Sequence, residues 1–128
     1  MKILIQAAKI LDSNSPFHKK EKNVLLQNGR ITEIGDKNYQ ADKVIKAEGM
    51  ILSTGWFDLG TFIGDPGLEH KEDLESGSKA AMAGGFTEIA VLPNTLPCIQ
   101  TKNDVNYLTK GNDNRLLQIL PLETVKKN

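Results

Sequence analysis

The stretch GWFDLGTFIGDPGLEHKED, from Gly55 to Asp73, marks the point at which the character of the chain changes. Before it, short apolar runs alternate with turn signals. After it, apolar runs alternate with segments of helical pattern. We therefore predict a boundary at this stretch, with one domain over residues 1–54 and a second over residues 55–128.

Downstream of this stretch, strand and helix patterns alternate. The expected elements are a strand over 56–62, a helix over 72–83 ended by Gly84-Gly85, a strand over 86–94, a helix capped by Thr101, and a strand over 115–122. Glycine at a helix end permits the left-handed turn that closes it. The order β-α-β-α-β is typical of a parallel α/β sheet with right-handed crossovers.

Upstream of it, residues 1–54 favour a small sheet or sandwich. The start of the chain predicts a strand with Ile3, Ile5 and Ala7 on one face. Asn28-Gly29 lies between two apolar runs, and this dipeptide favours the positive φ angles of a tight hairpin turn. Residues 24–27 and 30–34 are therefore expected to pair. Two shorter apolar runs flank Glu48-Gly49.

Composition excludes several classes of protein. Of the 128 residues, 39% are hydrophobic and 25% are charged, and the sixteen basic and sixteen acidic residues cancel. Because the charges balance, we expect no nucleic-acid partner. We also expect no membrane partner, because no apolar run approaches the ~20 residues of a membrane helix. The N-terminus lacks the pattern of a secretory signal, which favours a cytoplasmic protein. Cys98 is the single cysteine and is expected to be a half-buried loop residue.

The strand predicted over 56–62 lacks the metal-binding side chains that a catalytic strand in this position would carry. Regular alternation places Asp58, Gly60 and Phe62 on one face, opposite Phe57, Leu59 and Thr61. A hydrolytic metal site on such a strand uses two histidines two positions apart, since that spacing directs both imidazoles at one metal. Glycine and phenylalanine occupy those two positions here and offer no ligand.

The whole segment resembles the dihydroorotases of the cyclic amidohydrolase superfamily. The similarity is carried by motifs in the same order as in that family: Gly55-Trp56-Phe57-Asp58, Asp65-Pro66-Gly67-Leu68-Glu69-His70-Lys71-Glu72, Ser76-Gly77, Ala80-Ala81-Met82-Ala83-Gly84-Gly85-Phe86-Thr87 and Pro93-Asn94-Thr95-Leu96-Pro97. The resemblance covers nearly the whole chain, and its central third is the most specific part.

The resemblance implies the N-terminal part of a TIM-type barrel preceded by a small β-sandwich domain. It also implies a two-metal zinc site that opens the cyclic amide of dihydroorotate in pyrimidine biosynthesis. The two histidine ligands of the family align with Gly60 and Phe62, and its substrate-binding arginine aligns with Gly64. Of the site residues expected in this part of the family, Asn94 remains, as a substrate contact. We therefore expect no catalytic residue and no metal ligand.

Other polar residues do not replace the missing ligands. Asp58 and Asp65 are seven positions apart, a spacing that specifies no metal geometry, and Asp58 is expected to form hydrogen bonds at the barrel mouth. His18 and His70 lie in polar segments and are expected at the surface. Gly84-Gly85 lacks the surrounding pattern of a phosphate-binding loop, so helix termination explains both glycines.

Three hypotheses follow for function. The first is a non-catalytic dihydroorotase-like protein, a pseudoenzyme that binds aspartate carbamoyltransferase or associates with itself. The second is an active cyclic amidohydrolase that uses unconventional ligands. The third is an independent binding module. A complete barrel takes about 250 residues, and the later metal ligands of the family lie on later strands, so we also expect the chain to be a fragment with an exposed final strand.

Overall fold

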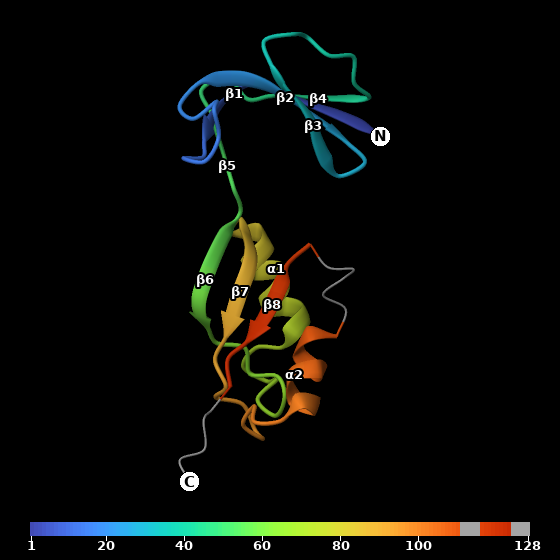
Figure 1. Ribbon diagram of the computed structural model, residues 1–128. Helices are drawn as coiled ribbons and strands as arrows, with labels where there is room; N and C mark the ends of the chain where they lie inside the picture. Colours follow the sequence, from blue (N-terminus) through green and yellow to red (C-terminus); the bar gives the residue numbers. More distant parts are fainter. Residues whose placement is uncertain (111–115, 124–128) are drawn as a thin grey trace. The chain divides into compact units, whose positions relative to one another are not determined.

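The computed structural model of the protein describes residues 1–110 and 116–123. The chain forms two compact units, Met1–Thr54 and Gly55–Asn128, each with its own sheet (Figure 1). Within the described part of the chain, we find no helix with the length and apolar character needed to cross a membrane.

The first unit is a five-stranded sheet built around its first strand. The strands are β1 (Lys2–Leu11), β2 (Glu21–Gln27), β3 (Arg30–Gly35), β4 (Lys43–Lys46) and β5 (Ile51–Ser53). They form the order β3-β2-β1-β4, and β5 also pairs with β1. β1 is antiparallel to β2 and parallel to β4 and β5. Both β4 and β5 can pair with β1 because its first half lies beside β4 and its second half beside β5.

The predicted hairpin is present. β2 and β3 pair in antiparallel fashion up to Gln27 and Arg30. Asn28 and Gly29 between them have φ angles of 52° and 76°. Two consecutive positive φ angles match the right-handed twist of the flanking strands. The prediction from the Asn-Gly dipeptide is confirmed.

The predicted face of β1 is interrupted by a bulge. The pairing of β1 with β2 shifts between Ile5 and Ala8, and Ala7 has a φ of 59°. The Ala7 amide donates to Asn23 Oδ1 at 2.9 Å instead of to the strand ladder. The prediction that Ala7 shares a face with Ile3 and Ile5 by regular alternation is therefore wrong. The buried residues of this strand are Leu4, Ala8 and Ile10.

The second unit has the predicted β-α-β-α-β order. Its elements are β6 (Trp56–Thr61), α1 (Leu74–Ala83), β7 (Phe86–Val91), α2 (Lys102–Thr109) and β8 (Gln118–Pro121). The three strands are parallel in the order β6-β7-β8, and Figure 1 shows their arrowheads pointing the same way. β8 is shorter than the strand predicted over 115–122, and Arg115 lies outside the described residues.

Both helices of the second unit pack against the same face of its sheet. One buried cluster contains Ile63, Ile89, Val91, Ile99, Leu108, Leu117 and Ile119, and Leu74, Ala81, Phe86 and Val105 pack against it. Leu74 and Ala81 belong to α1, and Val105 and Leu108 belong to α2. Full burial of a Val, Leu or Ile side chain contributes about 1.5–3 kcal/mol, so this cluster is a main source of stability for the second unit.

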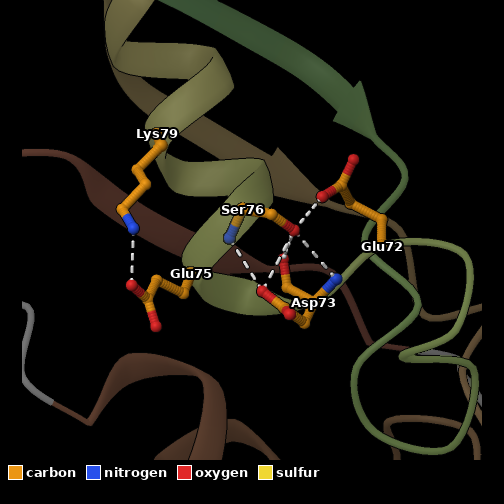
Figure 2. Close-up of polar contacts among 5 residues, drawn as sticks. All are labelled: Glu72, Asp73, Glu75, Ser76 and Lys79. Atoms are coloured by element: carbon orange, nitrogen blue, oxygen red, sulfur yellow. Dashed lines mark hydrogen bonds and ion pairs between the residues drawn. The ribbon is translucent and has the colours of Figure 1, made fainter.

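Capping side chains define where the two helices start. Asp73 Oδ1 accepts from the Ser76 amide at 2.7 Å, so α1 begins after Asp73, two residues later than predicted. Figure 2 shows this cap, with Glu72 accepting from the Ser76 hydroxyl and Glu75 paired with Lys79. At the other end, Gly85 takes a φ of 85°. The Thr101 hydroxyl accepts from the Asp104 amide as predicted.

The cap of α1 predicts a specific loss of stability in acid. Hydrogen bonds from the Ser76 amide and hydroxyl lower the pKa of Asp73 below its ordinary value of 3.8. Because the pKa of Asp73 is lower in the folded state, its ionised carboxylate stabilises that state at pH values above 3.8. This stabilisation is lost as the pH falls through the folded-state pKa. We expect Asp73→Asn, which keeps a capping oxygen, to flatten the acid limb of a plot of unfolding free energy against pH. An unchanged acid limb would contradict this.

Candidate functional site

The carboxyl ends of β6 and β7 meet at one edge of the parallel sheet, which is where ligands bind in sheets of this kind. Strand pairing sets which side chains share a face there. Asp58 lies beside Ile89, and Ile89 is in the core under the helices. Phe57 and Leu59 lie on the opposite face, where they are 50% and 73% exposed. Asp58 therefore points toward the helix layer.

A bulge at Gly60 changes the alternation predicted for this strand. Pairing with β7 shifts between Leu59 and Thr61, and Gly60 has a φ of 119°. The extra residue returns Thr61 to the helix side, beside Val91, where regular alternation would have placed it with Leu59. The prediction is therefore wrong in placing Thr61 opposite Asp58. It is also wrong in placing Phe62 with Asp58, because Phe62 lies between helix-side Thr61 and the buried Ile63.

Contacts on both sides of Gly60 fix the bulge. The Thr61 hydroxyl donates to Asp58 Oδ2 at 2.6 Å, and the Thr61 carbonyl accepts from the Leu92 amide at 2.9 Å. Ile63 is fully buried in the core, whereas the adjacent Phe62 is 38% exposed. Asp58 thus forms a hydrogen bond at the end of the strand, as predicted, and does so with the next helix-side residue.

Two glycines permit close backbone packing here: Gly64 within the loop after β6, and Gly67 between that loop and the loop after β7. A Cβ on Gly64 would lie 2.4 Å from the Leu68 carbonyl oxygen, and a Cβ on Gly67 would lie 1.9 Å from the Leu96 carbonyl oxygen. The Leu96 amide donates to the Pro66 carbonyl at 3.0 Å. The position that aligns with the substrate-binding arginine of the family therefore has no room for a side chain.

Asp65 is buried and already bonded. It is 7% exposed, its Oδ1 accepts from the Tyr107 hydroxyl at 2.7 Å, and its Oδ2 accepts from the Leu74 amide at 3.4 Å. The hydrogen bond from the Tyr107 hydroxyl to Asp65 is the main reason that the pKa of Tyr107 is raised. Sequence reasoning missed the pair because Tyr107 lies 42 positions from Asp65 and no local pattern connects them.

The remaining residues singled out from the sequence do not converge on a site. Asn94 follows β7 and is exposed, so its role as a substrate contact stays a prediction. His70 is exposed as expected. His18 is half-buried, and its Nδ1 accepts from the Asp12 amide at 3.1 Å, so it closes a turn instead of lying free at the surface. Cys98 is half-buried in a loop as expected.

The residues at the strand ends do not fit the zinc site of the family. Gly60 and Phe62 carry no donor atom, Asp58 faces the helix layer, and Asp65 is committed to Tyr107. Over residues 1–110 and 116–123, no group of three or more histidine, cysteine, aspartate or glutamate side chains has an arrangement that could hold a metal ion.

A cavity of about 660 Å³ lies elsewhere in the second unit. It borders α1 through Leu74, Ser78 and Met82, and Leu117 forms part of its wall. Its lining includes none of Gly60, Phe62 and Asn94. The cavity is therefore distinct from the positions at which the resemblance places catalysis.

Comparisons of sequence find no matching family model, but they find closely similar curated proteins. The dihydroorotase of Aquifex aeolicus is 38% identical over 130 residues, which cover 99% of this chain and 30% of that protein. The dihydroorotase of Sulfurihydrogenibium sp. is 39% identical over 129 residues, covering 98% of this chain and 30% of that protein. The chain thus spans about 30% of the length of these relatives.

Solved structures share the fold. The L-hydantoinase of Arthrobacter aurescens matches with a TM-score of 0.75 and 22% identity, over 94% of this chain and 27% of that protein. A molinate hydrolase matches with a TM-score of 0.64 and 18% identity, over 94% of this chain and 29% of that protein. The α/β fold with a preceding β-domain, predicted from the sequence, is therefore confirmed, and this hydantoinase shares it.

Sequence and fold agree on the same relationship. Dihydroorotases match this chain over nearly its whole length, including the ordered motifs between Gly55 and Pro97. The fold is also that of a hydantoinase. The chain belongs to the dihydroorotase family of cyclic amidohydrolases, as a divergent member in which Gly60 and Phe62 stand where the family has its two metal-binding histidines.

Proposed function

We propose that this chain is a non-catalytic dihydroorotase-like protein that keeps the amidohydrolase fold and acts through protein contacts in pyrimidine biosynthesis, in the cytoplasm. The single observation that carries the proposal is the end of β6. There, Gly60 and Phe62 offer no metal ligand, Asp58 faces the helix layer beside Ile89, and a bulge turns Thr61 to the same side.

The substrate side of the site supports the same proposal. An arginine can hold a substrate carboxylate by two parallel hydrogen bonds, but Gly64 packs against the backbone of Leu68. The loops that follow β6 and β7 are joined by the Leu96–Pro66 hydrogen bond and by the close approach of Gly67 to Leu96. Both observations support a protein that offers neither a metal ligand at positions 60 and 62 nor an arginine for a dihydroorotate carboxylate at position 64.

The proposed partner is aspartate carbamoyltransferase, with self-association as the alternative. Apolar side chains remain exposed on and beside the second sheet, among them Leu59 at 73%, Leu116 at 88% and Leu120 at 44%. Surfaces of this kind mark protein contacts more often than isolated exposed residues do. Sedimentation of the chain alone and mixed with the carbamoyltransferase separates the two partners, and a monomer in both samples would contradict both.

The experiment that tests the lack of catalysis is a dihydroorotate ring-opening assay with added zinc. The dihydroorotase of Aquifex aeolicus serves as the positive control. We expect no rate above the buffer background. The matched variant is Asn94→Ala, which removes the one substrate contact that the resemblance carries over.

The alternative, an active amidohydrolase with unconventional ligands, makes the opposite prediction. It requires a zinc-dependent rate in the native chain that falls in the Asn94→Ala variant. That result would overturn the proposed function and would assign Asn94 to the substrate site.

A further inference from the structure

We propose that the cavity beside α1 binds a small organic cation, in which an ammonium group is joined to an apolar body. The volume of the cavity, about 660 Å³, is within the range of about 300–1,000 Å³ that is typical of small-molecule sites. The proposal does not depend on the proposed function, because the cavity includes none of the positions at which the resemblance places catalysis.

The apolar part of the cavity favours a ligand with an apolar body. One wall is a stripe of α1, in which Leu74, Ser78 and Met82 are spaced four residues apart and so lie on one side of the helix. Leu116 and Leu117 add two further apolar side chains. Leu116 is 88% exposed, so an apolar group bound against it would remove apolar surface from water.

Ser78 places an unused polar group within this apolar stripe. The residue is 8% exposed, and its hydroxyl is buried without a hydrogen-bond partner among residues 1–110 and 116–123. A buried hydroxyl that stays unpaired destabilises the folded state. Because serine has a single heavy-atom side-chain torsion, rotation about it can bring the hydroxyl toward a bound polar group. A ligand with a polar end would therefore supply the missing partner.

The charges around the cavity favour a positive polar end. The lining includes three carboxylates, those of Asp65, Asp73 and Glu75, and one ammonium, that of Lys79. Glu75 and Lys79 pair with each other at 2.6 Å, and their side chains are 79% and 68% exposed (Figure 2). These two charges offset each other at the rim. The two aspartates remain as the negative groups of the cavity.

The same two aspartates disfavour an anion at the start of α1. Asp65 Oδ2 accepts from the Leu74 amide at 3.4 Å, and Asp73 Oδ1 accepts from the Ser76 amide at 2.7 Å. These bonds occupy amides of the first helical turn, which would otherwise attract a negative group. A carboxylate has about four acceptor positions, so both aspartates can still accept from an ammonium. The cavity is therefore expected to select a cation over an anion.

The test is a calorimetric titration of the full 128-residue chain with three probes that share one apolar body. Phenylbutylammonium, phenylbutanol and phenylbutyrate differ in their polar end, which is positive, neutral and negative. Charge-assisted hydrogen bonds are about twice as strong as neutral ones. We therefore expect the ammonium to bind about tenfold or more tightly than the alcohol, and the butyrate to bind most weakly. Equal affinities for ammonium and alcohol, tighter binding of butyrate, or no binding of the ammonium would overturn the proposal.

Ser78→Ala tests whether the ligand occupies this cavity. The variant removes a hydroxyl that has no partner among the described residues, so we expect its melting temperature to stay the same or to rise. Its affinity for phenylbutylammonium should fall about threefold or more. Ser53→Ala is the matched control, because Ser53 is an exposed serine of the first unit and does not line the cavity. Native affinity in Ser78→Ala, or an equal loss in the control, would overturn the proposal.

Asp73→Asn tests the role of charge. The variant keeps a capping oxygen and removes one negative charge from the cavity lining. We expect the preference for phenylbutylammonium over phenylbutanol to fall about threefold or more, with the affinity for phenylbutanol unchanged. An unaltered preference would overturn the proposal. None of these titrations involves zinc or dihydroorotate, so their outcome leaves the proposed function as it stands.

Discussion

Replacing Gly67 with alanine is expected to lower the free energy of unfolding of the second unit by more than about 3 kcal/mol. The new Cβ would lie 1.9 Å from the Leu96 carbonyl oxygen, and the φ of 92° at this position already disfavours a side chain. The opposing atom belongs to the backbone and cannot rotate away. The loops after β6 and β7 would have to separate, with loss of the Leu96–Pro66 hydrogen bond.

Urea unfolding followed by tryptophan fluorescence measures this effect, because Trp56 is the single tryptophan and lies in the second unit. Gly85→Ala is the matched control. Gly85 also has a positive φ, of 85°, but the atom nearest to its Cβ would be Trp56 Cδ1 at 3.9 Å, an ordinary contact. We expect the control to cost about 1–2 kcal/mol, the penalty for a residue with a Cβ in a left-handed conformation. Equal effects of the two substitutions would show that the loops do not pack as described.

Shortening Ile63 to alanine is expected to cost about 2–5 kcal/mol, the range found for large-to-small substitutions in packed cores. Ile63 is fully buried and contacts the helix layer, where its Cδ1 would lie 3.1 Å from a Cβ on Gly77. The cavity left by the substitution would open at the point where β6 leaves the sheet.

Phe62→Ala provides the comparison for Ile63→Ala, since the two residues are adjacent and differ mainly in direction. Phe62 is 38% exposed, so its truncation should cost less than about 1 kcal/mol. Denaturant unfolding of both variants measures the difference. If Phe62→Ala proved the more costly of the two, the strand would continue without the bulge, with position 62 turned inward.

The elements of the fold could be predicted because their signals are local. Asn28-Gly29 specified its hairpin through two positive φ angles, and the Thr101 hydroxyl capped α2 by accepting from the amide of Asp104, three residues away. Gly84-Gly85 marked the end of α1 because only the backbone of the helix terminus is involved. Each of these structural features depends only on residues close together in the sequence.

The strand bulges could not be predicted in the same way. Regular alternation was assumed for β1 and β6, and a bulge interrupts it at Ala7 and at Gly60. Both bulges are stabilised by contacts that depend on tertiary structure: Ala7 by the side chain of Asn23, and the end of β6 by Leu92 and the burial of Ile63. A sequence pattern of period two carries no information about such partners.

For the candidate site, the sequence could predict which side chains are present, but not how they are arranged. The replacement of donor side chains at Gly60 and Phe62 is visible in the sequence. The direction of Asp58 and the commitment of Asp65 to Tyr107 are not, because they depend on the register of β6 with β7 and on packing between residues 42 positions apart. The structure thus adds that both nearby carboxylates are already hydrogen-bonded within the protein.

Zinc binding by the native chain is the most direct measurement of the central claim. His18 and His70 are its only histidines, so equilibrium dialysis with zinc is performed on the native chain and on a His18→Ala/His70→Ala variant. The account predicts no stoichiometric zinc in either protein. One or more zinc ions per native chain would contradict it, and zinc retained after both histidines are removed would show that other side chains of this chain assemble a metal site.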